Sequence, residues 1–390
     1  MLPIAGDSIT KGVEMKANFA IGHGFGIYAG HCRQREVHRE PRSVTRQRSG
    51  SVGVMFSLRR LVPGILSAAA FLFAQTPPDR ASLPTNQLLS EPGPTFRFAD
   101  SSLPTPLTFI VYGDQRFTDP ANVVAADPKS RAWLARQIAA EHPAAIVLNG
   151  DVPLNGDVAN DHAVFRSETK PWRDAGIKVF PSLGNHEFRG DSRKALENWW
   201  ANFPELKNRR WYSAELGSRV YAIALDTNAS LMPGSDQARW VEKQIDGLPA
   251  SIDFVVLTIH HPPVADIQKH IEVDHNPQKN EIALRNYLSK AAAKSHARFL
   301  VSAGHIHNYE RHIVDDVIYL VAGGGGAQPY YVERTPDDLY QSILFPNLHY
   351  VKVTVEKDRL RGAMYRIVNP EAPSLDKELK DSFEILARPR

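Results

Sequence analysis

The feature that most constrains the fold is a repeated alternation of short apolar runs with helical patterns between residues 107 and 326. Six of the runs are rich in β-branched and aromatic residues, as buried strands are. They lie at 107–112, 145–148, 178–183, 220–225, 254–259 and 298–302. Several are apolar at almost every position, which is typical of strands covered on both faces. The alternation therefore predicts a layered α/β domain.

Apolar residues at helical spacing separate these runs. Leu134 and Ile138 form one such pair, and longer sets occur at 241–248 and 284–291. Ser235 precedes the first of these longer sets in a position suited to a helix N-cap. After Gly326 the pattern changes to strands, expected at 347–355 and 360–367, which should pair into the sheets.

The predicted domain occupies residues 106–370, and the segments around it differ in composition. Residues 75–105 are rich in proline and serine and are expected to be a linker or a strap over the domain surface. Residues 371–390 are expected to be a polar tail. Residues 1–54 combine many arginines with no apolar period, which predicts a disordered or mis-assigned upstream segment.

Residues 55–74 have the pattern of a secretory signal peptide, in which Arg59 and Arg60 precede an apolar run too short to span a membrane. We therefore expect an exported protein, periplasmic or secreted, whose mature chain begins near Gln75 and is not stably inserted in a membrane. An uncleaved anchor or a buried helix are the alternatives. Cys32 is the only cysteine and lies upstream of this segment, which excludes disulfides from the mature chain.

The charge balance argues against a nucleic-acid partner. The chain carries 46 Lys and Arg against 43 Asp and Glu, and its first 74 residues hold 10 of the basic and 4 of the acidic residues. The remainder is therefore mildly acidic, whereas nucleic-acid binding needs a basic face or stripe.

Nearly every predicted strand ends in a loop that contains a glycine and a potential metal ligand. The polar residues in these loops are Asp114, Asp151, Asn185, His186, Glu187, His260, His261, His305 and His307. Sites in α/β sheets lie outside the carboxyl ends of the strands, and glycine lets the backbone turn sharply there. Each residue alone could be an ordinary turn or strand-end residue. Together, carboxylate, amide and imidazole ligands predict a site for Zn, Mn or Fe.

Five blocks of these residues resemble the signature of the calcineurin-like metallophosphoesterase superfamily. They are Asp114, Gly150-Asp151, Gly184-Asn185-His186-Glu187, His260 and Gly304-His305-Ile306-His307, and the Asn308-Tyr309-Glu310-Arg311 that follows resembles the purple-acid-phosphatase branch. The resemblance covers about residues 107–326. It implies a four-layer metallophosphatase-like sandwich of two mixed β-sheets flanked by helices, with two divalent or trivalent metal ions.

Carried over residue by residue, the resemblance implies that Asp151 bridges the two metals. Asn185, His260 and His305 would complete one metal site, and Asp114 and His307 would belong to the other. The resemblance makes His186 a catalytic group that contacts the phosphoryl oxygens or protonates the leaving oxygen, with Glu187 holding it in place.

The sequence departs from the family pattern at two positions. Arg116 stands where most members have a histidine, and Leu154 stands where purple acid phosphatases have a tyrosine. The site with Asp114 and His307 therefore lacks its usual third ligand. Either water fills that position, or the planar Arg116 guanidinium binds the substrate phosphate directly.

The histidines expected at the surface are His270, His275 and His349.

The implied reaction is hydrolysis of a phosphate monoester through a metal-bridging hydroxide, with a small-molecule phosphate ester as the partner. The first alternative is a phosphodiesterase acting on nucleotides or lipids, because the signature specifies phosphoryl chemistry and not the ester type. The second is a metal- or phosphate-binding protein with little turnover, because the missing ligand would weaken one metal.

Overall fold

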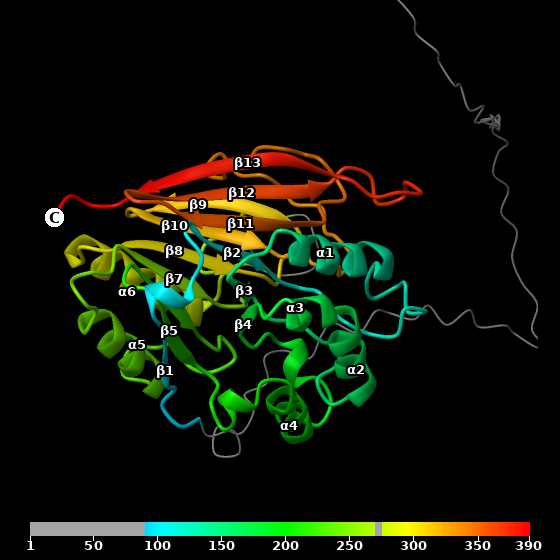
Figure 1. Cartoon of the computed structure of the whole chain (residues 1–390), viewed down its shortest axis with the longest axis horizontal. Helices are drawn as coiled ribbons and strands as arrows, with labels where there is room; N and C mark the ends of the chain where they lie inside the picture. Colours follow the sequence, from blue (N-terminus) through cyan, green and yellow to red (C-terminus); the bar gives the residue numbers. More distant parts are fainter. Residues whose placement is uncertain (1–89, 270–274) are drawn as a thin grey trace, which may run out of the picture. The chain divides into compact units, whose positions relative to one another are not determined.

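Two mixed β-sheets face each other in the computed structural model, which describes residues 90–269 and 275–390 (Figure 1). In these residues one sheet has seven strands, in the order β1 (Thr95–Phe98), β5 (Tyr212–Leu216), β6 (Val220–Ala224), β7 (Phe254–Thr258), β8 (Arg298–Ala303), β10 (Val317–Ala322) and β9 (Tyr309–Val314). The other has six described strands, in the order β13 (Lys377–Leu386), β12 (Arg359–Ile367), β11 (His349–Val355), β2 (Leu107–Tyr112), β3 (Ala145–Leu148) and β4 (Lys178–Pro181).

Each sheet contains a run of adjacent parallel strands. Strands β2, β3 and β4 run parallel in the six-stranded sheet, and β6, β7, β8 and β10 run parallel in the seven-stranded sheet. Parallel strands end at the same edge of a sheet, so the loops that follow them gather there. In the six-stranded sheet the antiparallel pairs, β13 with β12, β12 with β11 and β11 with β2, form the other half.

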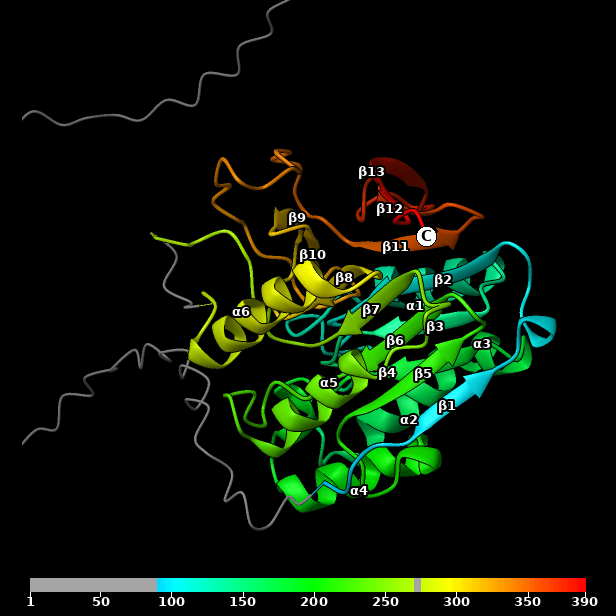
Figure 2. The same cartoon turned by 90° about the vertical axis from the view of Figure 1, so that its left-hand side faces the viewer.

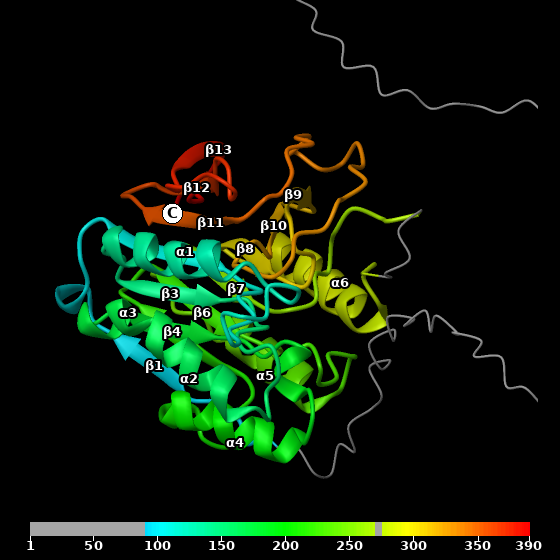
Figure 3. The ribbon, with the colours of Figure 1, turned by 90° about the vertical axis from the view of Figure 1, so that its right-hand side faces the viewer.

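Helices cover the outer face of each sheet. Helices α5 (Asp236–Asp246) and α6 (Lys279–Lys294) lie over the seven-stranded sheet, as Figure 2 shows. The helices seen from the opposite side in Figure 3 are α1 (Pro128–Ala140), α2 (Ala159–Glu168), α3 (Lys170–Asp174) and α4 (Ser192–Asn202). Short 3-10 helices occur at Asp100–Ser102, His186–Phe188 and Pro204–Leu206. The arrangement is the expected four-layer α/β sandwich.

Strand β7 illustrates why the central strands are apolar at every position. Phe254 and Val256 belong to the core that includes residues of both sheets, whereas Val255 and Leu257 pack with the residues of α5 and α6. Successive side chains of a strand point to opposite faces, so a strand between two layers needs apolar residues throughout. All five residues of β7 are buried.

The structure confirms the predicted strands of the parallel core and the two predicted strands after Gly326, with boundaries that differ by a few residues. It also confirms the predicted N-cap, because the Ser235 hydroxyl accepts a hydrogen bond from the Ala238 amide at 3.3 Å. The predicted signal segment at 55–74 and the upstream residues 1–54 lie outside the described residues. Among the described helices, none combines the length and apolar character needed to cross a membrane.

The expected polar tail at 371–390 was wrong for half of its length, because residues 377–386 form β13. This strand pairs with β12 at the edge of the sheet and buries only part of one face, through Phe383 and Ile385. An edge strand can carry many polar residues because its other face meets water. The expected linker at 75–105 also contains a strand where it is described, since β1 pairs in parallel with β5.

Candidate metal centre

The candidate site lies where loops from both sheets meet, at the carboxyl ends of β2, β3, β4, β7 and β8. Four of its residues have left-handed backbone conformations: φ is 61° at Asp114, 46° at Arg116, 54° at Asp151 and 71° at His305. Non-glycine residues in such conformations cost about 1–3 kcal/mol each and gather at functional sites. Here the sharp turns bring the side chains back over the strand ends.

Two glycines permit the close approach of the loops. A Cβ atom at Gly184 would lie 2.3 Å from the Asp151 Oδ1 atom, and a Cβ atom at Gly304 would lie 2.4 Å from the Asp114 Oδ2 atom. Both distances are far below van der Waals contact, so only glycine fits at either position. The two carboxylates therefore pack directly against backbone.

Four potential ligand atoms lie close together around His260: its own Nε2 atom and one atom from each of three other residues. Its Nε2 atom lies 3.0 Å from Asn185 Oδ1, 3.2 Å from Asp151 Oδ1 and 3.2 Å from His305 Nδ1. The other ring nitrogen, Nδ1, lies 2.8 Å from the Asn149 carbonyl oxygen. A carbonyl oxygen can only accept a hydrogen bond, so Nδ1 carries the ring proton and donates it. In this tautomer the His260 Nε2 lone pair faces two other acceptors, Asn185 Oδ1 and Asp151 Oδ1. A cation fits this arrangement.

The second group of ligand atoms is built around Asp114. Its Oδ1 atom lies 3.5 Å from His307 Nε2, a buried atom with no hydrogen-bond partner in the described part of the chain. The His307 Nδ1 atom donates to the Gln328 carbonyl oxygen at 2.6 Å, which leaves the Nε2 lone pair facing the carboxylate. Asp114, Asp151 and His260 together could also hold an ion.

The two buried carboxylates have opposite pKa shifts. Burial raises the pKa of Asp114, and the nearby Asp151 charge adds to this effect. Burial also opposes ionisation of Asp151, but His186, His260 and Arg116 together hold the pKa of Asp151 well below its usual range. Adjacent buried carboxylates cannot both ionise easily without added positive charge, which metal ions would supply.

His186 points its free nitrogen toward the same centre. Its Nδ1 atom donates to the Leu154 carbonyl oxygen at 2.6 Å, while Nε2 lies 3.6 Å from Asp151 Oδ2 and makes no hydrogen bond to any described residue. Burial lowers the pKa of His186 well below its usual value. The neutral ring thus presents Nε2 to any group bound between it and Asp151.

Glu187 has different partners from those the sequence implied. Its carboxylate accepts backbone N–H bonds from Asp151 at 3.0 Å, Val152 at 2.8 Å and Gly184 at 2.7 Å. Burial, with a further contribution from the Asp151 charge, raises the pKa of Glu187 to about 8. The ring of His186 is instead held by the Leu154 carbonyl oxygen, so Glu187 joins the loops after β3 and β4.

Arg116 lies beside the carboxylate of Asp151. Its Nη2 atom is 3.3 Å from Asp151 Oδ2, 15% of the side chain is exposed, and its Nε atom has no hydrogen-bond partner among the described residues. The guanidinium therefore keeps donors that a ligand could use.

The structure adds two residues that the sequence did not assign to the site. His275, expected at the surface, places its Nδ1 atom 3.0 Å from His305 Nε2. The Tyr330 ring stacks on His307 at 4.0 Å between centroids and on His275 at 5.0 Å. No strand or helix pattern leads to either residue, so the sequence carries no signal for them. His349, also expected at the surface, is fully buried, and His270 lies outside the described residues.

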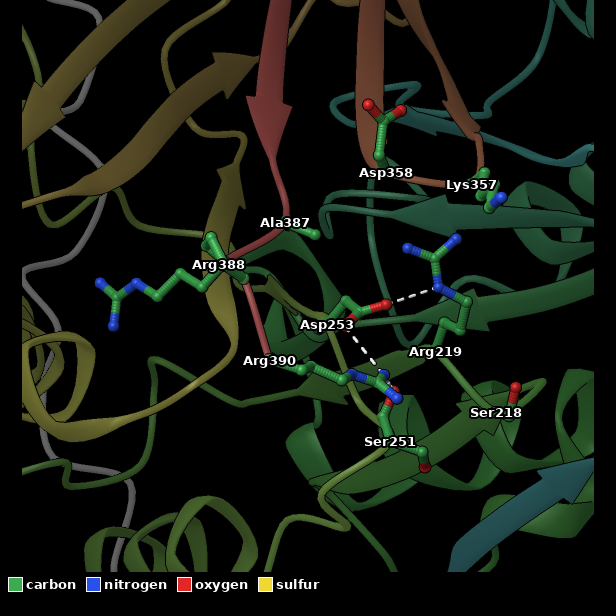
Figure 4. Close-up of a pocket in the computed structure, with 10 residues that line it drawn as sticks. Ser218, Arg219, Ser251, Asp253, Lys357, Asp358, Ala387, Arg388 and Arg390 are labelled. Carbon is green, nitrogen blue, oxygen red and sulfur yellow. Dashed lines mark hydrogen bonds and ion pairs between the residues drawn. The ribbon is translucent and has the colours of Figure 1, made fainter.

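A separate cavity of about 440 Å³ lies away from these residues (Figure 4). Arg219 and Asp253, which line it, directly precede β6 and β7, so it lies at the amino ends of the parallel strands. Asp253 pairs with Arg219 and, at 3.0 Å, with Arg390. These three charged residues are thus paired with one another, whereas the cluster at the carboxyl ends brings potential metal ligands together and is the candidate site.

Residues 109–309, just over half of the chain, match the family model of calcineurin-like phosphoesterases. No curated protein sequence matches the chain. The fold is similar to that of the purple acid phosphatase PPD1 of yellow lupin (Lupinus luteus), with 17% identity and a TM-score of 0.58, over 74% of this chain and 56% of that one. It is also similar to PhoD, with 14% identity and a TM-score of 0.51, over 74% of this chain and 72% of the other.

Proposed function

The chain belongs to the calcineurin-like phosphoesterase family, and from this premise we propose that it hydrolyses a phosphate monoester at two bound metal ions. Its membership makes it a hydrolase of phosphoric esters. The observation that carries the two-metal proposal is the convergence of lone pairs around His260 Nε2, together with the unpartnered Nε2 atom of His307 beside Asp114. Lone pairs that face one another in a buried site are stabilised by a cation.

We assign one metal to Asp151, Asn185, His260 and His305, and the other to Asp114, Asp151 and His307. Oxygen and imidazole ligands without a thiolate suit Zn, Mn or Fe. Such a pair of ions supplies a hydroxide at neutral pH and offsets the charge that develops on the phosphoryl oxygens. The Asn149 carbonyl oxygen fixes the tautomer of His260, and the Gln328 carbonyl oxygen fixes that of His307.

The remaining residues would act on the substrate itself. His186 Nε2, once it carries a proton, could donate a hydrogen bond to a phosphoryl or leaving-group oxygen, because no described residue occupies it. Arg116 can bind a non-bridging oxygen with its free donors. A monoester carries one more negative charge than a diester, so this additional cation favours the monoester.

Metal analysis and turnover measurements test the proposal together. The purified protein, loaded in turn with Zn, Mn and Fe, should bind two ions and hydrolyse p-nitrophenyl phosphate faster than bis-p-nitrophenyl phosphate. Asp151→Asn should lose both metal and turnover, whereas Glu197→Gln, on the exposed surface of α4, should change neither. Faster diester hydrolysis would favour the phosphodiesterase alternative, and bound metal without turnover of either ester would favour a binding protein.

We also propose that the mature protein is exported, because residues 55–74 have the sequence pattern of a signal peptide. Peptide mapping of the exported protein should recover sequence from about Gln75 onward. Recovery of peptides from residues 1–54 in the exported protein would contradict this.

A further inference from the structure

A half-buried histidine contacts one of the proposed metal ligands from outside the candidate metal centre. The Nδ1 atom of His275 lies 3.0 Å from His305 Nε2, and the two rings meet edge to face, with an angle of 88° between their planes. The other ring nitrogen of His305, Nδ1, lies 3.2 Å from His260 Nε2, among the proposed ligand atoms. His305 thus has one nitrogen toward the metals and one toward His275.

The two ring nitrogens of His305 have different roles when a metal is bound. A neutral imidazole binds a metal through the nitrogen that carries no proton, so binding through Nδ1 places the ring proton of His305 on Nε2. Nε2 then donates to His275 Nδ1, which is the acceptor, and the proton of the His275 ring lies on its own Nε2. A hydrogen bond to the outer nitrogen of a ligating histidine fixes its tautomer and its ring orientation.

The other two proposed imidazole ligands have backbone partners in this role. His260 Nδ1 donates to the Asn149 carbonyl oxygen at 2.8 Å, and His307 Nδ1 donates to the Gln328 carbonyl oxygen at 2.6 Å. Both rings are therefore held by the strand ends and loops of the fold itself. His305 differs, because the contact at its outer nitrogen comes from a side chain in the segment between β7 and α6.

The residue that follows His275 is held firmly in that segment. The Asn276 side chain accepts from the Gln268 amide at 3.0 Å and donates to the Gln268 carbonyl oxygen at 3.4 Å. The Asn276 carbonyl oxygen accepts from the side chain of Gln278, the N-cap of α6, at 2.8 Å. The Gln278 amide in turn donates to Glu281 in the first turn of α6 at 3.0 Å. His275 is thus presented to His305 from an anchored position beside the start of a helix.

The ring of His275 has a second contact at the same centre. It stacks on Tyr330, with 5.0 Å between ring centroids and an angle of 18°, and Tyr330 also stacks on His307 at 4.0 Å. The two contacts of His275 use different properties of the side chain: an acceptor nitrogen toward His305 and a flat ring toward Tyr330. Different substitutions can therefore remove them one at a time.

We propose that His275 is a positioning residue of the metal centre, which accepts a hydrogen bond from His305 Nε2 and so holds the His305 ring with Nδ1 toward the metal. This inference rests on the proposed function and adds to its metal centre a residue that is not itself a ligand. Outer partners of metal-binding histidines typically contribute a factor of about 10–100 in metal affinity. The loss of the acceptor should therefore weaken the metal that His305 binds.

Two substitutions of His275 separate the acceptor from the ring. His275→Phe keeps a flat ring beside Tyr330 but has no acceptor, whereas His275→Asn loses the ring but keeps an acceptor oxygen close to the position of Nδ1. The dissociation constants of the two ions are measured on the zinc-loaded full chain by competition with a chromophoric chelator. His275→Phe should weaken one ion about 10–100-fold and the other less than about threefold, and His275→Asn should stay within about threefold of wild type for both.

His296→Phe is the matched control, because it makes the same substitution two residues before β8, at the amino ends of the parallel strands. It should change neither dissociation constant, and a thermal melt of each variant checks that it is folded. Equal losses in His275→Phe and His275→Asn would overturn the inference, since packing rather than the acceptor would then matter. Wild-type affinities in His275→Phe would overturn it as well. A wild type that binds no zinc would instead contradict the proposed function itself, and with it the role of His275.

Discussion

Individual side chains in the site are oriented by the backbone, so that one nitrogen of each ring stays available. His186 and His307 both donate from Nδ1 to a carbonyl oxygen and both leave Nε2 buried without a hydrogen bond to the described residues. The difference between them lies in their neighbours. His307 faces Asp114, a proposed metal ligand, whereas His186 approaches Asp151 from the side where Arg116 also lies.

We expect His186→Ala to separate chemistry from metal binding. Turnover of an aryl phosphate should fall by about 10²–10³, since the variant loses a group that can hydrogen-bond or protonate the substrate. Metal content should stay at the wild-type level, because all the proposed ligands remain. Measured kcat, elemental analysis and a thermal melt on the same preparation check this, the melt serving to exclude misfolding. An emptied metal site in His186→Ala would mean that His186 is itself a ligand.

The sequence predicted which residues meet at the site because each follows a strand of the parallel core, and parallel strands end together. It did not predict how Glu187 is used, since three backbone N–H bonds depend on the exact approach of the loops after β3 and β4. His275 and Tyr330 were missed for a related reason. Both arrive from irregular loops, where no periodicity indicates which side chains turn inward.

The helices and strands outside the parallel core are joined by polar contacts as well as apolar packing. Glu141, at the C-cap of α1, bonds to Lys352 on β11 at 2.8 Å, to the Tyr350 hydroxyl at 2.7 Å and to Lys377 on β13. Burial opposes its ionisation, but these hydrogen bonds lower the pKa of Glu141 to about 2. One carboxylate thus links three elements that are far apart in the sequence.

The contribution of Glu141 to stability should depend on pH. Its folded pKa lies below the ordinary value of 4.5, so the stabilisation is present above pH 4.5 and is lost as the pH falls toward 2. Glu141→Gln should lower the free energy of unfolding at pH 7 by roughly 1–2 kcal/mol, a discounted figure because water partly screens the group. The difference from wild type should shrink as the pH falls below 4.5. Urea midpoints at pH 7, 4.5 and 3 measure this.

Glu197→Gln serves as the control for that series, since Glu197 is exposed on α4. A Glu141→Gln deficit of equal size at all three pH values would show that the ionised carboxylate is not the stabilising group.

At the level of elements, the sequence predicted strands where apolar residues were continuous or alternated clearly. β13 was missed because it lies at an edge and buries only two of its ten residues. The hairpin of β9 and β10 was also missed, although β10 is continuously apolar and a turn at Asp315 and Asp316 precedes it. Both turn residues have positive φ, at 48° and 65°, as two-residue hairpin turns of type I′ require. Aspartate tolerates this conformation, but the sequence Asp-Asp indicates a two-residue hairpin turn less strongly than Asn-Gly does.

On the scale of the whole molecule, the proposed ligands come from both sheets. Asp114, Asp151 and Asn185 follow strands of the six-stranded sheet, whereas His260 and His305 follow strands of the seven-stranded sheet. The sheets are also joined near this edge by direct hydrogen bonds: Asn149 Nδ2 donates to Ser302 Oγ, and Thr258 Oγ1 donates to Asn149 Oδ1, both at 2.9 Å. Bound metal would therefore connect the two halves of the sandwich at the functional edge.

Removal of metal should lower the stability of the entire domain. An ion at 1,000 times its dissociation constant stabilises the folded state by about 4 kcal/mol, and for a domain of this size each kcal/mol corresponds to roughly 2–4 °C in Tm. Chelator should thus lower Tm by about 8 °C or more, and added Zn, Mn or Fe should restore it. The difference in Tm between the metal-loaded and the chelated protein should shrink in acid, because protonated histidines cannot bind metal. Asp151→Asn should show no Tm difference between chelator and metal, because it removes the shared ligand. An unchanged wild-type Tm after complete metal removal would mean that the direct hydrogen bonds between the sheets suffice to hold this edge together.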